Sequence, residues 1–236
     1  MDRLLELSSV AAKQTMFAQA VNTNNLANIS TPGFRKDLVA FSGTNASAEQ
    51  KTTIDASSGV VSTTGRNLDI AVSDQGWLAI AAPDGSEAYS RRGDLRVDAF
   101  GQLTDGAGNT VLGNGGPIAV NDFSNIEISD QGFISITPRG GDATEQQTID
   151  QLKLVTLNAA DLAKGADGLL RLRNNQVADQ DPTVRVQSGA LEASNVSSVE
   201  ALVRMMDLAR KYESQVKIMQ HADQDQQALD SILKFS

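Results

Sequence analysis

The chain has 236 residues, enough for one sizeable domain or a domain with appendages, and its 40% hydrophobic and only 4% aromatic content predicts a modest core and much extended structure. It contains no cysteine, which excludes disulfides, thiolate metal sites and cysteine nucleophiles. Its formal net charge of −9 argues against nucleic acid as a partner. Residues 1–35 and 196–236 are nearly neutral, so many copies could pack through these ends without repulsion.

Residues 2 to about 27 show the spacing of a helix, with Leu7, Val10, Phe17 and Val21 on one face. We assign residues 1–36 to an N-terminal assembly segment. No cleavable signal is recognisable at the N-terminus, because Glu6 interrupts the apolar run. No segment approaches the roughly 20 apolar residues that span a bilayer.

The stretch "NNLANISTPGFRK" at 24–36 ends this helix. Asparagine amides donate and accept hydrogen bonds without carrying charge, so self-assembly is one possible role for this stretch. Pro32 and Gly33 predict a turn with positive φ at the glycine, followed by the aromatic Phe34. An ordinary helix end with a polar turn is the alternative interpretation.

Residues 37–66 are polar and small, and we predict a loop or linker with a short strand near 59–63. Residues 67–173 alternate short apolar runs with glycine-containing turns, which predicts a central all-β domain of short antiparallel strands. The segments "SDQGWLAI" at 73–80 and "SDQGFISI" at 129–136 resemble each other, and we interpret each of them as part of the same kind of β-hairpin.

Residues 174–195 are predicted to be a linker, with Ser194 or Asn195 as the N-cap of a helix over 196–236. Apolar residues recur there at alternating spacings of three and four, which is the pattern of a coiled-coil seam: Met205, Leu208, Tyr212, Met219, Leu229 and Leu233, with Gln215, Ala222 and Gln226 in register. A second stripe, which includes Val199, Leu202, Val203 and Met206, widens the apolar face. The fold class we predict is therefore mixed α and β, with the two terminal helices pairing as a coiled-coil-like domain.

The sequence contains few residue patterns that indicate catalysis. His221 is the sole histidine and lies beside Asp223 and Asp225, which we interpret as a solvated helix surface rather than a metal site or a base. The tripeptide Arg92–Asp94 has an adhesion sequence, but its setting favours a β-turn. We expect no catalytic, cofactor or metal site and hence no enzyme.

Three segments in the right order resemble the flagellar axial proteins, the family of rod, hook and hook-associated subunits. They are "NNLANISTPGFRK" near the N-terminus, "GRNLDIAVSDQGWLAIAAPDGSEAYSRRGDLRVDAFGQLTDGAGNTVLG" at 65–113 and "SGALEASNVSSVEALVRMMDLARKYESQVKIMQ" at 188–220. The short length and the lack of a large inserted domain resemble the proximal-rod members most.

The resemblance implies a structural subunit of the bacterial basal-body rod, part of the drive shaft between motor and hook. Such a subunit would leave the cell through the flagellar export apparatus without signal cleavage and would polymerise in the periplasm with copies of itself and with proximal and distal rod proteins. The interface residues expected from the resemblance and the helix patterns are Leu7, Val10, Phe17, Val21, Asn24, Asn25, Leu26, Ala27, Asn28, Pro32, Gly33, Phe34, Met205, Leu208, Tyr212, Met219, Leu229 and Leu233.

Three alternatives stay open at this point. The chain could be a distal-rod or hook-type axial subunit, although hook proteins usually carry an extra outer domain. It could be a coiled-coil adaptor outside the flagellum that uses the same helices. A carboxylate-dependent hydrolase in the β domain is the enzymatic alternative.

Overall fold

The computed structural model describes residues 2–42, 49–73, 75–140, 146–165, 167–174 and 176–233. The chain divides into two compact units. The helical unit comprises the described residues within 1–27, 37–52 and 197–236, and the β unit comprises those within 28–36 and 53–196. The expected combination of a pair of terminal helices with a central antiparallel region is confirmed.

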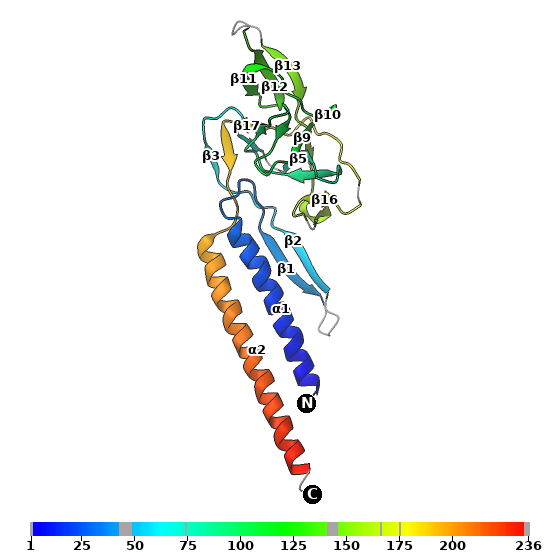
Figure 1. The fold of residues 1–236 in the computed structure, drawn as a ribbon, viewed down its shortest axis with the longest axis vertical. Coiled ribbons are helices and arrows are strands. Elements are labelled where there is room, and N and C mark those ends of the chain that lie inside the picture. Colours follow the sequence, from blue (N-terminus) through cyan, green and yellow to red (C-terminus); the bar gives the residue numbers. More distant parts are fainter. Residues whose placement is uncertain are drawn as a thin grey trace. The chain divides into compact units, whose positions relative to one another are not determined.

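Two long helices dominate the helical unit. Helix α1 spans Asp2–Ala27 and helix α2 spans Ser198–Leu233. They lie side by side and run in opposite directions (Figure 1). In the described part of the chain, neither helix combines the length and apolarity that crossing a bilayer requires.

The predicted loop at 37–66 contains three strands: β1 (Asp37–Ser42), β2 (Glu49–Ile54) and β3 (Val61–Thr63). Strands β1 and β2 form a two-stranded sheet beside α1. The polar sequence of β2 gives no period-two signal, so its strand state depends on pairing with β1, which local pattern alone could not predict.

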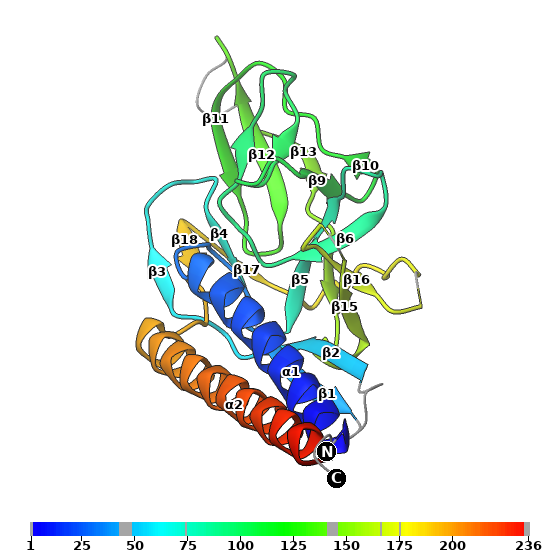
Figure 2. The same ribbon diagram turned by 60° about the horizontal axis from the view of Figure 1, so that its bottom comes forward.

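The β unit is built on one sheet of nine strands, which Figure 2 shows around β5 and β6. Its order is β15-β16-β6-β5-β9-β8-β7, with β10 added to β9 and β14 added to β5. The members are β5 (Gly76–Ala81), β6 (Glu87–Ser90), β7 (Arg96–Val97), β8 (Leu103–Thr104), β9 (Thr110–Gly113), β10 (Gly116–Pro117), β14 (Leu154–Thr156), β15 (Leu162–Lys164) and β16 (Leu170–Leu172). A short 3₁₀ helix, Ala159–Asp161, precedes β15.

Three smaller sheets complete the β unit. One has three antiparallel strands: β11 (Phe123–Ile128), β12 (Phe133–Pro138) and β13 (Gln147–Gln151). The other two join distant parts of the chain, since β4 (Ile70–Val72) pairs with β17 (Val186–Ser188), and β3 pairs with β18 (Ala190–Glu192). The predicted linker at 174–195 thus supplies two strands that bring the residues before α2 back against 61–72.

The two similar segments begin with the same turn. The Gly76 N–H donates to the Ser73 carbonyl at 3.0 Å, and the Gly132 N–H donates to the Ser129 carbonyl at 2.9 Å. The turn at 129–132 joins the paired strands β11 and β12, whereas β4 pairs with β17 and β5 with its sheet neighbours. The turn is therefore repeated, but only the second copy makes a hairpin.

The core of the β unit consists of two apolar clusters. The larger one is built mostly from Ile, Leu and Val of the sheets and includes Leu78, Ile80 and Leu103, all fully buried. The smaller one surrounds Trp77 and Tyr89. The Tyr89 hydroxyl donates to Glu87 Oε1 at 3.0 Å and accepts from the Ala178 N–H at 2.8 Å. Glu87 is also paired with Lys153 at 2.8 Å, so this buried phenol belongs to a satisfied polar network.

Alkaline pH should weaken the β unit through Tyr89. Burial raises the pKa of Tyr89 to about 12, the Ala178 N–H opposes the shift, and the bond to Glu87 adds to it. Because the folded pKa lies above the unfolded value of about 10, this stabilisation is complete below about pH 10 and is lost as the pH rises toward 12. We expect the urea midpoint, followed by Trp77 fluorescence, to fall across this range, and to fall less in Tyr89→Phe. An equal decline in both proteins would contradict the prediction.

Candidate assembly site

The seam between the two helices is built from small residues on α1 and larger ones on α2. On α1 the buried positions are Ala12, Thr15, Ala18, Asn22 and Asn25. On α2 the predicted seam is the covered face: Ala201, Leu208 and Ala222 are buried, and Met205, Tyr212 and Met219 are half-buried. The side chains of Leu229 and Leu233 lie outside the described residues. Small residues on α1 allow the two backbones to approach closely, and they leave room for the larger side chains of α2.

A buried amide links the two helices directly. Asn22 Nδ2 donates to the backbone carbonyl of Ala201 at 2.8 Å. By helical spacing, Ala18 and Thr15 lie on the same side of α1 as Asn22, so this side faces α2.

The apolar face predicted for α1 lies on a different side. Phe17 packs edge-on against Phe41 of β1, with ring centroids 6.5 Å apart and an interplanar angle of 69°. Val10 and Val21 share that side by spacing and are half-buried, while Leu7 is 51% exposed. Large apolar residues on α1 therefore mark its contact with β1, and alanines mark its contact with α2.

The residues of the asparagine-rich stretch at 24–28 differ in burial and in the bonds that they make. Asn25 is buried and binds Asp37 in both directions: Nδ2 donates to the Asp37 carbonyl at 2.9 Å, and the Asp37 N–H donates to Oδ1 at 2.8 Å. This pair ties the end of α1 to the start of β1. Asn24 and Ala27 are exposed, and Leu26 and Asn28 are half-buried.

The Pro32–Phe34 turn has the predicted positive φ, which is 67° at Gly33. A Cβ at Gly33 would lie 2.1 Å from the Arg91 carbonyl oxygen, so only glycine fits here. The Gly33 N–H donates to the backbone carbonyl of Glu192 at 2.7 Å. Phe34 is half-buried, and Lys164 Nζ lies 4.9 Å from its ring centroid.

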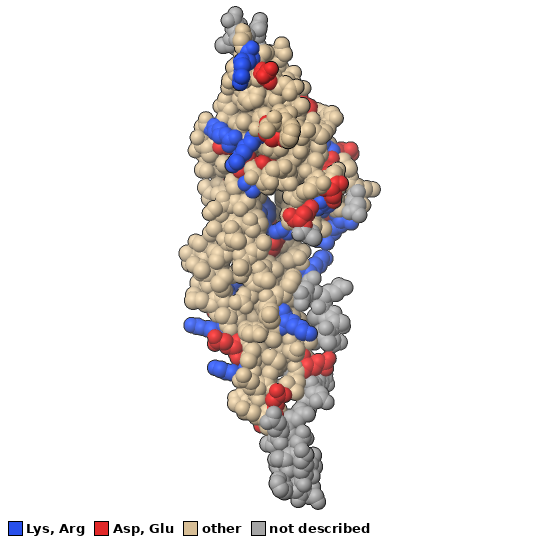
Figure 3. Space-filling view, viewed as in Figure 1, with Lys and Arg blue, Asp and Glu red and all other residues tan. Residues whose placement is uncertain are grey.

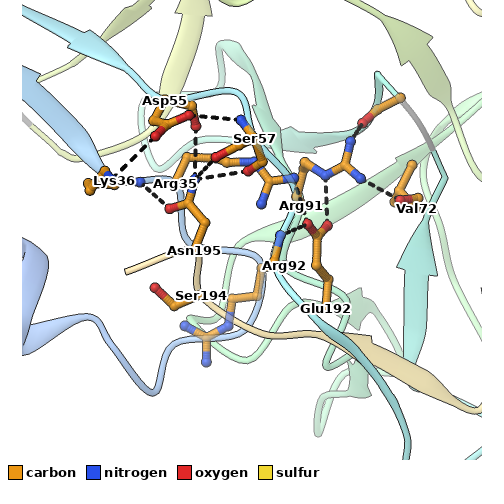
Figure 4. Close-up of polar contacts among 12 residues, drawn as sticks. Arg35, Lys36, Asp55, Ser57, Val72, Arg91, Arg92, Glu192, Ser194 and Asn195 are labelled. Atoms are coloured by element: carbon orange, nitrogen blue, oxygen red, sulfur yellow. Dashed lines mark hydrogen bonds and ion pairs between the residues drawn. The ribbon is translucent and has the colours of Figure 1, made fainter. Parts of the chain in front are cut away.

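One buried carboxylate, that of Glu192, holds the segment after α1 against the segment before α2 (Figure 4). Its Oε1 lies 2.7 Å from Arg35 Nη2 and accepts from the Gly59 N–H at 2.7 Å, and its Oε2 accepts from Arg91 Nε at 2.9 Å. The Glu192 side chain is 1% exposed, and those of Arg35 and Arg91 are 2% and 3% exposed. We call Arg35, Arg91 and Glu192 the ionic hub.

The three members of the hub come from three distant places. Arg35 lies two residues before β1, Arg91 directly after β6, and Glu192 at the end of β18 opposite Val61. Arg91 also donates through Nη1 to the Gly76 carbonyl at 2.7 Å and through Nη2 to the Val72 carbonyl. Burial lowers the pKa of Arg35, Glu192 opposes this shift, and repulsion from Arg91 adds to it.

Asn195 makes a second connection beside the hub. Its Oδ1 accepts from the Lys36 N–H at 2.7 Å, and its Nδ2 donates to the carbonyls of Ser57 and Asp55 at 2.9 and 3.1 Å. Asn195 is thus a crosslink rather than a helix cap. Helix α2 begins at Ser198, and the Glu200 N–H donates to Ser197 Oγ at 3.4 Å, so Ser197 is the capping residue.

The hub was not foreseen from the sequence. Arg35, Arg91 and Glu192 are ordinary surface types, and nothing local distinguishes them from solvated charges. The one available signal was the placement of Glu192 between the apolar Leu191 and Ala193 in a stretch that resembles a known family. The remaining chemical candidates lie elsewhere: His221 is exposed, and Arg92 pairs with Asp94 at 2.6 Å. Within the described ranges, no three acidic or histidine side chains gather into a metal site.

Three sequence models of protein families match the chain. "Flagella basal body rod protein" matches residues 5–35, "Flagellar hook protein FlgE/F/G D1 domain" matches 71–136, and "Flagellar basal body rod FlgEFG protein C-terminal" matches 187–232. The first match includes most of α1 and Arg35, and the third includes Glu192, Asn195 and most of α2.

Curated relatives match over the whole length. The flagellar basal-body rod protein FlgF of Escherichia coli K12 is 38% identical and that of Salmonella typhimurium is 37% identical, in both cases over 100% of each chain. The flagellar basal-body rod protein FlgG of Bacillus subtilis is 32% identical over 87% of this chain and 89% of the relative.

Removing the hub carboxylate should destabilise the β unit strongly. Glu192→Gln removes the carboxylate that two buried guanidinium groups share, which costs about 3–5 kcal/mol. Urea unfolding followed by Trp77 fluorescence measures the loss. Glu127→Gln is the matched control, because Glu127 is exposed in the same unit and its substitution should stay within about 0.5 kcal/mol. A variant at 192 as stable as the control would contradict the assigned role of the hub.

Removing the amide between the helices should weaken the helical unit modestly. Asn22→Ala loses the bond to Ala201, which lowers the free energy of unfolding by about 0.5–1.5 kcal/mol. The higher helix propensity of alanine offsets part of this loss. Thr23→Ala gains a similar helix propensity at an exposed position of the same helix and loses only a local bond to the Gln19 carbonyl, so it serves as the reference. The difference between the two variants, in thermal unfolding followed by far-ultraviolet circular dichroism, should be about 1 kcal/mol. Identical unfolding curves would show that the bond contributes nothing.

Proposed function

Since this chain belongs to the flagellar basal-body rod protein family, in which its relatives include FlgF proteins along their full length, we propose that it polymerises through its terminal helices. Membership of the family makes it a structural subunit of the basal-body rod and not an enzyme. The finer proposal is that it forms part of the proximal rod, within the drive shaft between motor and hook. Identities of 38% and 37% to the FlgF proteins of Escherichia coli and Salmonella typhimurium, against 32% to the FlgG protein of Bacillus subtilis, support this place over the distal rod.

A stripe of exposed apolar side chains on α2 carries the proposal. Val199, Leu202, Val203 and Met206 are 70%, 50%, 48% and 55% exposed. They lie at helical spacing on the flank of the seam, so one surface of the first turns of α2 is apolar. Figure 3 shows a mainly uncharged surface over the helix pair on the face in view. A subunit of a polymer is expected to present such a surface, and neighbouring subunits would cover it.

The proposal includes coiled-coil-like packing of α1 on α2, for which the heptad spacing on α2 is the support. It also assigns to assembly the exposed members of the predicted interface, Leu7, Asn24 and Ala27, and the turn residues Pro32–Phe34 that follow them. The partners we propose are copies of this chain, the other proximal rod proteins and the distal rod protein. We further propose passage through the flagellar export apparatus without signal cleavage and a final location in the periplasm, as the family resemblance implies.

A charge in the apolar stripe should abolish assembly while leaving the subunit folded. Leu202→Asp would place a carboxylate in a surface that becomes buried in the rod, which costs several kcal/mol for each contact made. We expect loss of swimming and of rod completion in a strain that carries only this variant, with unchanged helix content in the purified subunit.

Ser214→Asp is the matched control, because Ser214 is exposed on the same helix outside the stripe. It should swim normally. A fully motile Leu202→Asp strain would refute assembly through this surface.

A further inference from the structure

The turn between β9 and β10 contains an asparagine that is followed by a glycine. Asn114 and Gly115 connect Gly113 to Gly116, the residue with which it is paired. They form the sole Asn-Gly pair in the sequence, and both residues are exposed. Water therefore has access to the side-chain amide of Asn114 and to the backbone that follows it.

The chemistry of such a pair depends on the residue after the asparagine. The backbone nitrogen of that residue can attack the side-chain amide, and a side chain on the attacking residue hinders the approach. Glycine has no side chain, and its backbone reaches more conformations than that of any other residue. Space is open at Gly115 as well, since no described atom beyond the adjoining residues lies within 4 Å of the position of a Cβ.

We propose that Asn114 of the folded subunit is a site of spontaneous deamidation with water as the co-reactant. The Gly115 nitrogen forms a bond to Asn114 Cγ, and the side-chain nitrogen leaves as ammonia, which gives a cyclic imide. Water then adds to one of the two imide carbonyls and breaks its bond to nitrogen. The product is aspartate or isoaspartate, so each event adds one negative charge to the β unit. This modification does not depend on assembly of the subunit.

The amide of Asn114 has a partner that a carboxylate cannot bind. Asn114 Nδ2 donates to Gln151 Oε1 at 3.2 Å. Gln151 Nε2 donates to the Gln131 carbonyl at 2.9 Å, which keeps the side-chain oxygen of Gln151 directed toward Asn114. An ionised carboxylate is an acceptor only. Deamidation therefore brings two acceptors together and removes the bond between this turn and Gln151.

The new charge would also lie near an existing one. A Cβ on Gly113 would be 2.5 Å from Asp150 Oδ2, so the carboxylate of Asp150 lies directly beside the residue that precedes Asn114. Carboxylates that are close together repel each other. In isoaspartate the backbone gains a carbon atom as well, within a connection of only two residues between paired strands. Both products therefore weaken the attachment of the turn to its neighbours.

Ageing of the purified full chain tests the proposal. At mildly alkaline pH the attacking nitrogen loses its proton more readily, and peptide mapping by mass spectrometry should then find aspartate and isoaspartate in place of Asn114. Asn67 and Asn125 are internal controls, because both are exposed but are followed by branched side chains, and they should stay unmodified. Modification of Asn114 in urea-unfolded chain but not in folded chain would overturn the proposal.

Two variants complete the test. Gly115→Ala fits the open space at a backbone position outside the left-handed region, so it should fold normally and lose the modification. Deamidation of this variant at the rate of the unaltered protein would also overturn the proposal.

Asn114→Asp reproduces one product without ageing. Its urea midpoint, followed by Trp77 fluorescence, should be lower than that of the unaltered protein, and the midpoint of aged Gly115→Ala should not change. An unchanged midpoint in Asn114→Asp would contradict the structural effect assigned to the modification.

Discussion

The carboxylate of Glu192 is the constraint on which the organisation of the β unit depends. Its two oxygens meet two arginines whose positions in the chain are far apart, and its backbone carbonyl accepts from Gly33. Buried ion pairs contribute little net stability once their desolvation is counted, but breaking one is costly. We therefore interpret the hub as a device for register: it fixes which residue of the segment after α1 lies beside which residue of the segment before α2. Asn195 repeats that link with neutral bonds three residues further along the chain.

The two units use different polar chemistry for their long-range links. In the helical unit the buried links are amides: Asn22 to α2 and Asn25 to β1. In the β unit the fully buried link is the ionic hub, and the half-buried Asn195 adds neutral bonds beside it. An amide satisfies its partners without a counter-ion, so it can lie close to a surface that later becomes buried. On the proposal of assembly through the helices, neutral links avoid adding desolvation costs at the subunit contacts.

Much of the fold could be predicted from local sequence patterns, and the predictions that failed did so for identifiable physical reasons. Both helices, the order of the elements and most strands between 67 and 158 were predictable because period and turn chemistry are local properties. The face of α1 that meets α2 was not, since hydrophobicity ranks Phe17 above Ala18 whereas close helix packing favours alanine. Strands β17 and β18 and the hub depend on pairing with residues more than a hundred positions away, and no local pattern reports such a contact.

The exposed stripe on α2 and the seam beside it explain why a heptad can be read in α2 but not in α1. Helix α2 carries large apolar residues on two adjoining faces, one covered by α1 and one exposed in the single subunit. Helix α1 carries alanines toward α2 and its large residues toward β1, so its apolar positions do not fall into one seam. If α2 served only to pair with α1, the exposed side chains of Val199, Leu202 and Met206 would lower the solubility of the protein and have no structural role. Their exposure beside a nearly neutral helix pair fits the proposed polymer, in which neighbouring subunits would cover the face of α2 that α1 leaves open.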